Sequence, residues 1–476
     1  MRPLRLDQIA RWCEARLLGG DDAGAVCIDA VATDTRTLRP HPNPPPHAGE
    51  GVARRVLFVA LRGENHDAHD HLDAAIAGGA SALLVSRTVE TDLPQLLCGD
   101  TLQALGDLAA GVQQDRTATV LALTGSNGKT SVKTLLAGIC ARAGATFANP
   151  GNHNNEIGLP LAVLAAPEDA QYAIYEMGAG KPGDIAYLTS IAHPAVALVN
   201  NIMPAHLERM GSLLGVAQTK GAIYEALPTD GVAVINADDA FAPFFEKLAG
   251  ERRVLRFGLT ASAEVSAHAI VLAADGSRFQ LRTPQGEASI TLPLPGRHSV
   301  CNALAAAAMA LAAGIGLDAI AQGLCGAQPV HGRQVAHTLA NGCVLIDDSY
   351  NANPGSVEAA IATLAAGGGE SWLVLGDMAE LGEGSEDLHA QVGASARAAK
   401  IARLYTLGQL SRASARAFGS DARHFDERGA LIDALRADLH AGVRVLVKGS
   451  RSSAMDKIVA ALLPTGAATE GASHAA

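Results

Sequence analysis

The sequence predicts an α/β protein of three domains. We expect a central domain with a doubly wound parallel sheet and a phosphate-binding loop (P-loop), a small N-terminal α/β domain and a C-terminal Rossmann-like α/β domain. The chain of 476 residues is too long for one ordinary hydrophobic core. Short apolar runs alternate along it with helix-like stretches, which is typical of parallel α/β sheets. One of these runs, 120–124, leads into a glycine-rich turn and then into a helix.

The N-terminal domain is expected over residues 1–116. A first helix capped by Asp7 is followed by strands at 57–61 and 82–86, with a helix from residue 72 between them. The stretch 40–55 is rich in proline, which has no N–H donor for a sheet ladder. It is therefore predicted to be a solvated loop insertion.

The central domain is expected over residues 117–329. Apolar runs at 173–176, 195–199 and 232–235 each end in polar residues, as strands do where a ligand binds at their carboxyl ends. The stretch 303–317 is apolar throughout but shorter than a membrane span, which predicts a buried helix.

The C-terminal domain is expected over residues 330–476. Its strands are predicted at 343–346, 372–375, 404–407 and 443–447, alternating with helices as in another open sheet. The tail after Pro464 is small and polar and is expected to be disordered.

Composition narrows the possible functions. A net charge of -11 argues against a nucleic-acid-binding surface, which concentrates lysine and arginine. The seven cysteines are scattered and contain no C-x-x-C motif, so we expect reduced thiols. Without a signal-peptide pattern or a membrane span, the sequence indicates a cytoplasmic protein.

The run Gly125-Ser126-Asn127-Gly128-Lys129-Thr130-Ser131 predicts a P-loop. Its glycines let the backbone N–H groups close on a polyphosphate, and the following helix directs its positive end at the same place. Lys129 can neutralise the β- and γ-phosphates, while the Thr130 hydroxyl can reach Mg²⁺. The spacing is shorter than in the common G-x-x-x-x-G-K-[ST] motif. An ordinary turn would leave Lys129 unexplained at a helix N-terminus, where anions are favoured.

Three further residues follow predicted strands near this loop. Glu176 ends a strand and can hold Mg²⁺, while His206 and Lys220 come after the next strand. Each alone would be an ordinary surface or core residue, but together they favour a functional site. Farther along, Asp347 and Asp348 follow a buried strand and precede an Asn-Pro-Gly-Ser turn that can cap a helix.

At these residues the chain resembles the ATP-dependent Mur ligases of peptidoglycan synthesis. The likeness runs from Asp34 to Arg451, nearly the whole chain. Its most specific pieces are 151–158, 205–207, 295–298 with Asn302, 347–354 and 375–382. Matches this numerous, in this order, leave little room for accident.

The resemblance implies roles for individual residues. The three domains would bind the UDP-sugar peptide, ATP and the incoming amino compound, in that order. The ATP loop falls on 125–131, and the metal ligands on Thr130, Glu176, His206 and Lys220, with Lys220 carbamylated. Positions near the nucleotide fall on Asn302, Arg333 and Asp347. Substrate-binding positions fall on Asp34, Thr35, Arg36, Asn154, Asn155, Tyr350, Asn351 and Asn353.

The reaction implied by the resemblance joins D-alanyl-D-alanine to the tripeptide of UDP-N-acetylmuramoyl-tripeptide through an acyl phosphate. It would use ATP and two Mg²⁺ ions in a monomer, with Lys129 and the metal ligands as the catalytic set. The third residue of the tripeptide, diaminopimelate or lysine, stays open.

Three alternatives belong beside this reading. A ligase for another nucleotide-sugar peptide or for folate is less favoured by the Asn-Ala-Asn-Pro and Asn-Asn-Glu-Ile-Gly runs. A P-loop kinase or GTPase is a rival from another class, but the sequence contains no Asn-Lys-x-Asp guanine motif. A catalytically inactive nucleotide-binding regulator would not explain Glu176, His206 and Lys220 together.

Overall fold

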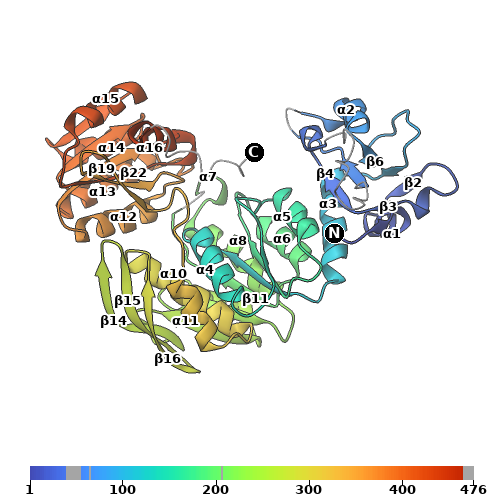
Figure 1. Ribbon diagram of the computed structural model, residues 1–476, viewed down its shortest axis with the longest axis horizontal. Coiled ribbons are helices and arrows are strands. Elements are labelled where there is room, and N and C mark those ends of the chain that lie inside the picture. Colours follow the sequence, from blue (N-terminus) through green and yellow to red (C-terminus); the bar gives the residue numbers. More distant parts are fainter. Residues whose placement is uncertain (39–54, 64–65, 205–206, 465–476) are drawn as a thin grey trace, which may run out of the picture. The chain divides into compact units, whose positions relative to one another are not determined.

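The computed structural model describes residues 1–38, 55–63, 66–204 and 207–464. Its alternating helices and strands confirm the α/β class (Figure 1). The chain divides into two compact units: Met1–Val120, Ala145–Met177 and Ala186–Pro194 form the first, and Leu121–Gly144, Gly178–Ile185 and Ala195–Ala476 the second. The domain limits expected at 116/117 and 329/330 stay predictions.

The first unit contains a five-stranded sheet in the order β2-β7-β6-β5-β4. Its strands are β2 (Arg16–Leu18), β4 (Ala30–Ala32), β5 (Val56–Val59), β6 (Ala80–Val85) and β7 (Gln95–Leu97). All neighbours in it are parallel except β2 and β7. A small antiparallel pair, β1 (Leu4–Arg5) and β3 (Cys27–Ile28), accompanies it. The strands predicted at 57–61 and 82–86 are β5 and β6, each displaced by a residue or two.

Helices and two further strands complete the first unit. They are α1 (Leu6–Trp12), α2 (Leu72–Ala77), α3 (Thr101–Gln114), α5 (Gly158–Ala165) and most of α6 (Asp184–Ala192), with the parallel pair β9 (Thr146–Ala148) and β10 (Tyr172–Glu176). The expected Asp7 cap is wrong: Arg5 is the N-cap of α1 without a side-chain cap bond. Asp7 lies inside the first turn, where it accepts hydrogen bonds from the Arg5 guanidinium. The insertion predicted at 40–55 lies almost wholly outside the described residues.

The phosphate-loop side of the second unit is built on seven consecutive strands of one sheet, in the order β16-β15-β14-β13-β12-β11-β8. Their bounds are β8 (Thr119–Thr124), β11 (Val196–Val199), β12 (Val232–Asn236), β13 (Arg253–Gly258), β14 (Val265–Ala273), β15 (Gly276–Thr283) and β16 (Gly286–Leu292). Strands β8 to β14 pair in parallel, whereas β14, β15 and β16 form an antiparallel extension, visible as long arrows (Figure 1).

Six helices accompany these strands: α4 (Lys129–Cys140), α7 (Leu207–Met210), α8 (Leu213–Glu225), α9 (Ala242–Ala249), α10 (Arg297–Ala312) and α11 (Leu317–Cys325). The single helix predicted over 303–317 is wrong in its limits. Helix α10 starts earlier, at Arg297, and ends at Ala312. Gly314, with φ +80°, lies in the turn that separates α10 from α11. The predicted burial is confirmed for residues 303–311, which are all buried, but not for the end of the stretch, where Gly314 and Gly316 are exposed.

The C-terminal part of the second unit is a six-stranded sheet in the order β17-β18-β22-β19-β20-β21. The strands are β17 (Val335–Thr338), β18 (Val344–Asp348), β19 (Glu370–Gly376), β20 (Arg403–Leu407), β21 (Ala422–Phe425) and β22 (Val443–Lys448). Only the β17–β18 pairing is antiparallel. The helices are α12 (Pro354–Ala366), α13 (Ser385–Ala398), α14 (Ser411–Phe418), α15 (Arg428–Asp438) and α16 (Asp456–Leu462).

This sheet is buried on both faces, as a parallel sheet with helices on each side requires. Trp372 and Val374 of β19 belong to one hydrophobic cluster, while their neighbours Leu373 and Leu375 belong to another. Successive side chains of a strand point to opposite faces, so one apolar run feeds both cores. No helix among the described residues is long and apolar enough to cross a membrane.

Candidate active site

The phosphate loop joins β8 to α4, and its two glycines are required by its geometry. Gly128 caps α4 in the left-handed conformation, with φ +79°. A Cβ atom there would lie 2.4 Å from Asn302 Oδ1 and 2.6 Å from Asn200 Nδ2. Gly125 has φ +147°, and its Cβ would meet Asn200 Cβ at 3.0 Å. Only glycine fits such close approaches with these backbone angles.

Two asparagines after β11 hold the loop from behind. The Ser126 N–H donates to the Asn201 carbonyl at 2.9 Å, and the Asn127 N–H donates to Asn201 Oδ1 at 2.8 Å. Asn200 Nδ2 donates to the Asn127 carbonyl at 2.9 Å and to Asn302 Oδ1 at 3.0 Å. The N–H groups of Ser126 and Asn127 are therefore already engaged, and the loop has fewer N–H donors for a phosphate than the sequence predicts. Helix α4 begins directly after the loop at Lys129, and a helix N-terminus directs its positive end at an anion.

Lys129 and Thr130 open α4 as predicted. The Lys129 ammonium donates to the Gly125 carbonyl at 2.8 Å, so its charge lies across the loop. The Thr130 hydroxyl accepts a hydrogen bond from Arg333 Nη2 at 2.9 Å. Although 203 residues separate these two residues in the chain, the structure brings the predicted nucleotide-binding arginine to the predicted Mg²⁺-binding hydroxyl.

Arg333 is oriented by an aromatic ring. Its guanidinium carbon lies 4.4 Å from the ring centroid of Tyr350, and that of Arg451 lies 5.8 Å from the same centroid. Such cation–π contacts fix a long side chain that would otherwise sample several rotamers. Tyr350 therefore positions Arg333.

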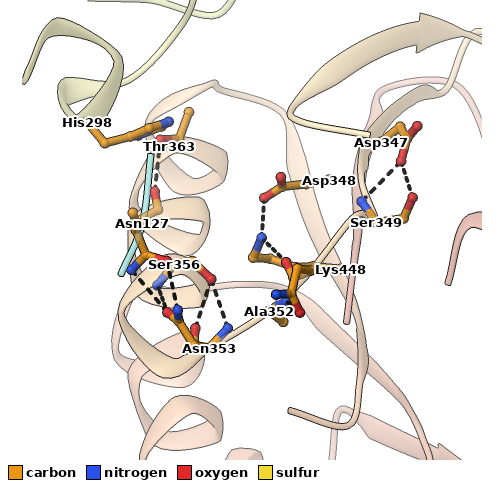
Figure 2. Close-up of polar contacts among 12 residues, drawn as sticks. Asn127, His298, Asp347, Asp348, Ser349, Ala352, Asn353, Ser356, Thr363 and Lys448 are labelled. Carbon is orange, nitrogen blue, oxygen red and sulfur yellow. Dashed lines mark hydrogen bonds and ion pairs between the residues drawn. The ribbon is translucent and has the colours of Figure 1, made fainter. Parts of the chain in front are cut away.

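The doubled aspartates end β18 and have separate partners. Asp347 accepts hydrogen bonds from the Ser349 N–H and hydroxyl, at 3.1 and 2.5 Å. Asp348 Oδ2 lies 2.8 Å from Lys448 Nζ, in a buried ion pair across neighbouring strands. Burial raises the pKa of Asp348, and the Lys448 charge opposes that rise. The two carboxylates turn to different sides of the strand (Figure 2).

The turn after β18 reaches back to the phosphate loop. Asn353 is the N-cap of α12, with Ser356 completing a capping box. Its side-chain amide also pairs with that of Asn127, and the two asparagines face one another beside the start of α12 (Figure 2). Asn351 is exposed, and its Oδ1 accepts from the Ala352 N–H at 2.9 Å.

Lys220 lies in α8 with only 1% of its surface exposed. Burial lowers its pKa to about 7, and the nearby Lys129 charge contributes to the shift. A neutral amine is therefore accessible near physiological pH. His206 lies outside the described residues.

The remaining predicted residues lie in the first unit. Glu176 ends β10, is 3% exposed, and accepts a hydrogen bond from Asn154 Nδ2 at 2.9 Å. Asn155 Oδ1 accepts from the Gly158 N–H at the start of α5. Asp34 accepts from the Arg36 side chain and backbone, beside Thr35, and the Arg36 side chain stays 87% exposed.

Sequence reasoning assigned no role to four residues that organise this site. They are Asn200, Asn201, Lys448 and Arg451. The first two follow β11 directly, just as Glu176 ends β10, so their place after a strand was a usable signal. Lys448 ends β22, where its register opposite Asp348 becomes visible only in the folded sheet.

The chain is similar to known proteins along most of its length. The family model of the Mur ligase middle domain matches residues 123–310, and that of the Mur ligase, glutamate ligase domain matches residues 332–451. A UDP-N-acetylmuramoyl-tripeptide–D-alanyl-D-alanine ligase of Escherichia coli (strain K12) is 46% identical over 454 residues, which cover 94% of this chain and 97% of the relative.

Two solved structures share the fold. A crystal structure of MurF from Acinetobacter baumannii has a TM-score of 0.89 at 32% identity, covering 97% of this chain and 99% of that one. The MurF ligase from Thermotoga maritima, in complex with ADP, has a TM-score of 0.80 at 25% identity, covering 91% and 96%.

Proposed function

Because the chain belongs to the Mur ligase family, we propose that it joins D-alanyl-D-alanine to the tripeptide of UDP-N-acetylmuramoyl-tripeptide, with ATP hydrolysed to ADP and phosphate. The observation that carries this proposal is the 46% identity, over 94% of this chain, to a ligase named for that reaction. The reaction supplies a peptidoglycan precursor, and its soluble nucleotide substrates suit the cytoplasm. The monomeric state stays a prediction.

The ATP site is proposed at the phosphate loop of the second unit, with Asn302, Arg333 and Asp347 near the nucleotide. Three features support it: the start of α4 directly after the loop, the Lys129 ammonium on the Gly125 carbonyl, and the Arg333 guanidinium on the Thr130 hydroxyl. A relative with the same fold has been solved in complex with ADP, which supports nucleotide binding by this chain. Arginine and lysine placed this way stabilise the charge that develops on a transferring phosphoryl group.

The chemistry proceeds in two steps. An oxygen of the tripeptide carboxylate attacks the γ-phosphorus of ATP, and ADP leaves, which gives an acyl phosphate. The amine nitrogen of the dipeptide then attacks the acyl carbon, and inorganic phosphate leaves as the amide forms and a proton is released. Lys129 and Arg333 act electrostatically in the first step and form no covalent bond.

Two Mg²⁺ ions are proposed, with Thr130, Glu176, His206 and Lys220 as protein ligands. The described residues contain no cluster of three or more His, Cys, Asp or Glu side chains that could hold a metal alone. That suits Mg²⁺, which usually takes one or two carboxylates, waters and substrate phosphates rather than an all-protein cage. When bound, the metal would neutralise phosphate charge. The Asn154 hydrogen bond orients the Glu176 carboxylate.

Lys220 is proposed to be carbamylated. A buried ammonium would repel a cation, whereas its neutral amine can add to the carbon of CO₂ and release a proton, which gives an anionic carbamate with two oxygens. Support comes from the 1% exposure of Lys220 and from its place in α8 without an ion pair to any described carboxylate. The competing possibility is an ammonium that contacts a substrate phosphate directly.

The division of labour among three domains is likewise a proposal. Asp34, Thr35 and Arg36 would meet the uridine diphosphate, since the Arg36 side chain stays 87% exposed while it pairs with Asp34. Asn154 and Asn155 would face the tripeptide. Tyr350 and Asn351, in the turn after β18, would contact the incoming dipeptide.

The decisive experiment measures phosphate release by the purified chain with ATP, Mg²⁺ and UDP-N-acetylmuramoyl-tripeptide. We expect release only when D-alanyl-D-alanine is added, because the acyl phosphate needs an amine. Single D-alanine, meso-diaminopimelate and glutamate with a folate acceptor serve as matched controls. Equal turnover with any of them would contradict the assignment within the family.

A further inference from the structure

The Asn127 side chain of the phosphate loop is paired with the side chain of Asn353. Its Nδ2 donates to Asn353 Oδ1 at 3.1 Å, and its Oδ1 accepts from Asn353 Nδ2 at 2.8 Å. Its backbone N–H and carbonyl are bonded to Asn201 and Asn200. The backbone N–H, the backbone carbonyl and both side-chain amide atoms of Asn127 thus have protein partners. The side chain therefore serves to hold the loop and not to bind nucleotide.

Asn353 is engaged just as fully. Its Oδ1 also accepts from the Ser356 N–H at 2.9 Å, and its own N–H donates to Ser356 Oγ at 3.0 Å. The side chain therefore performs two tasks, capping α12 and pairing with Asn127. A residue so occupied has little left for a substrate, which argues against the substrate-binding role implied by family resemblance.

The same turn contacts the phosphate loop a second time. Tyr350, three residues before Asn353, stacks on Arg333, which donates to Thr130 at the other end of the loop. Lys448 stabilises the turn, because its ammonium donates to the Asn351 carbonyl at 2.9 Å and forms an ion pair with the Asp348 carboxylate. The turn after β18 therefore contacts the loop at two places. Asn353 pairs with Asn127, and Tyr350 orients the Arg333 side chain that donates to Thr130.

We propose that the amide pair of Asn127 and Asn353 is a clamp that holds the phosphate loop against the segment 333–353, so that both asparagines position the nucleotide-binding groups without touching the nucleotide. This inference rests on the proposed function only in taking the loop 125–131 as the nucleotide site. Two hydrogen bonds in one planar pair specify distance and direction together. Without them, the binding-competent arrangement is a smaller fraction of the population, and the apparent nucleotide affinity falls by that fraction.

A double-mutant cycle on nucleotide affinity tests the clamp. The full-length wild type, Asn127→Ala, Asn353→Ser and the double variant are titrated with ADP and Mg²⁺ by calorimetry. Serine keeps the N-cap of α12 while losing the amide pair. We expect each single variant to bind ADP roughly tenfold more weakly, and the double variant no more than about twofold worse than the weaker single variant, because one interaction is lost in all three.

A second measurement separates positioning from a merely structural role. ADP should slow backbone hydrogen exchange in the segment 349–356 of the wild type, and this slowing should be lost in Asn353→Ser. The matched control is Asp100→Ser, which makes the same kind of exchange at the N-cap of α3, outside the proposed site. It should change neither ADP affinity nor exchange in that segment.

Unchanged ADP affinity in both single variants, losses that multiply in the double variant, or a wild type that does not bind ADP would each overturn the clamp. A wild type that binds ADP but releases phosphate without D-alanyl-D-alanine would contradict the proposed function alone. In that case the cycle still decides about the clamp.

Discussion

Lys220 illustrates how burial changes the chemistry available to a single residue. An exposed lysine is a charged ammonium at neutral pH, but at 1% exposure the pKa of this lysine falls to about 7. The sequence predicts a functional role for this residue, whereas its lowered pKa follows from its burial in α8 and from the charge of Lys129.

We expect Lys220→Ala to lose most activity, on the order of 10²–10³-fold, and formate to restore part of it by replacing the carbamate oxygens. Lys220→Arg keeps a positive charge but cannot form a carbamate, so formate should not rescue it. Because the amine is protonated below about pH 7, wild-type carbamylation and activity should fall as the pH drops through that value. Phosphate release across pH, with and without added bicarbonate, measures this.

Substantial activity of Lys220→Ala without any added acid would contradict the carbamate. So would an unmodified ammonium in a crystal structure with Mg²⁺ and nucleotide bound.

At the scale of an element, the start of α4 combines local and long-range requirements. The glycine-rich run predicted a strand, a turn and a helix, and all three formed within one residue of the expected limits. The reason that Gly128 cannot be replaced is not local, however, because the atoms that would crowd its Cβ belong to Asn302 and Asn200.

Gly128→Ala tests that distinction. We expect it to cost about 1–3 kcal/mol of unfolding free energy and to abolish ADP binding, because the new Cβ would displace the asparagines behind the loop. Gly314→Ala is the matched control, since Gly314 has φ +80° against +79° at Gly128 and nothing within 4 Å of its Cβ position. Urea denaturation and ADP titration of both variants give the comparison, and equal losses would mean that backbone strain alone explains the effect.

The elements missed by pattern reasoning share a physical cause. Strand β14 is largely exposed and has an irregular register. Its sequence therefore lacks the apolar pattern that would predict a strand. Strand β17 is a four-residue antiparallel edge of the C-terminal sheet, equally lacking a buried face. The strands that were predicted, such as β19 and β22, are buried on both faces and read as continuous apolar runs.

At the scale of the whole molecule, the proline-rich stretch tests how much chain the fold needs. We expect deletion of residues 41–53 to change the melting temperature by no more than a few degrees, because loop closure depends only logarithmically on length. Strands β4 and β5 on either side pair in parallel, and the Arg55 N–H is held by Asp29 Oδ1 at 3.0 Å. Thermal unfolding with and without UDP-N-acetylmuramoyl-tripeptide is the measurement. A drop beyond about ten degrees, or loss of ligand-induced stabilisation, would indicate that the stretch packs or binds substrate.

Patterns confined to about ten residues were enough to predict the phosphate loop, the parallel strands and the Lys129–Thr130 pair, because strand, turn and helix signals act between near neighbours in the chain. The partners of those residues could not be predicted in this way. Arg333 and Thr130 are 203 residues apart, and Asn353 and Asn127 are 226 residues apart. Such pairs depend on the register of buried strands and on the turn that follows β18, so they exist only once both sheets have folded.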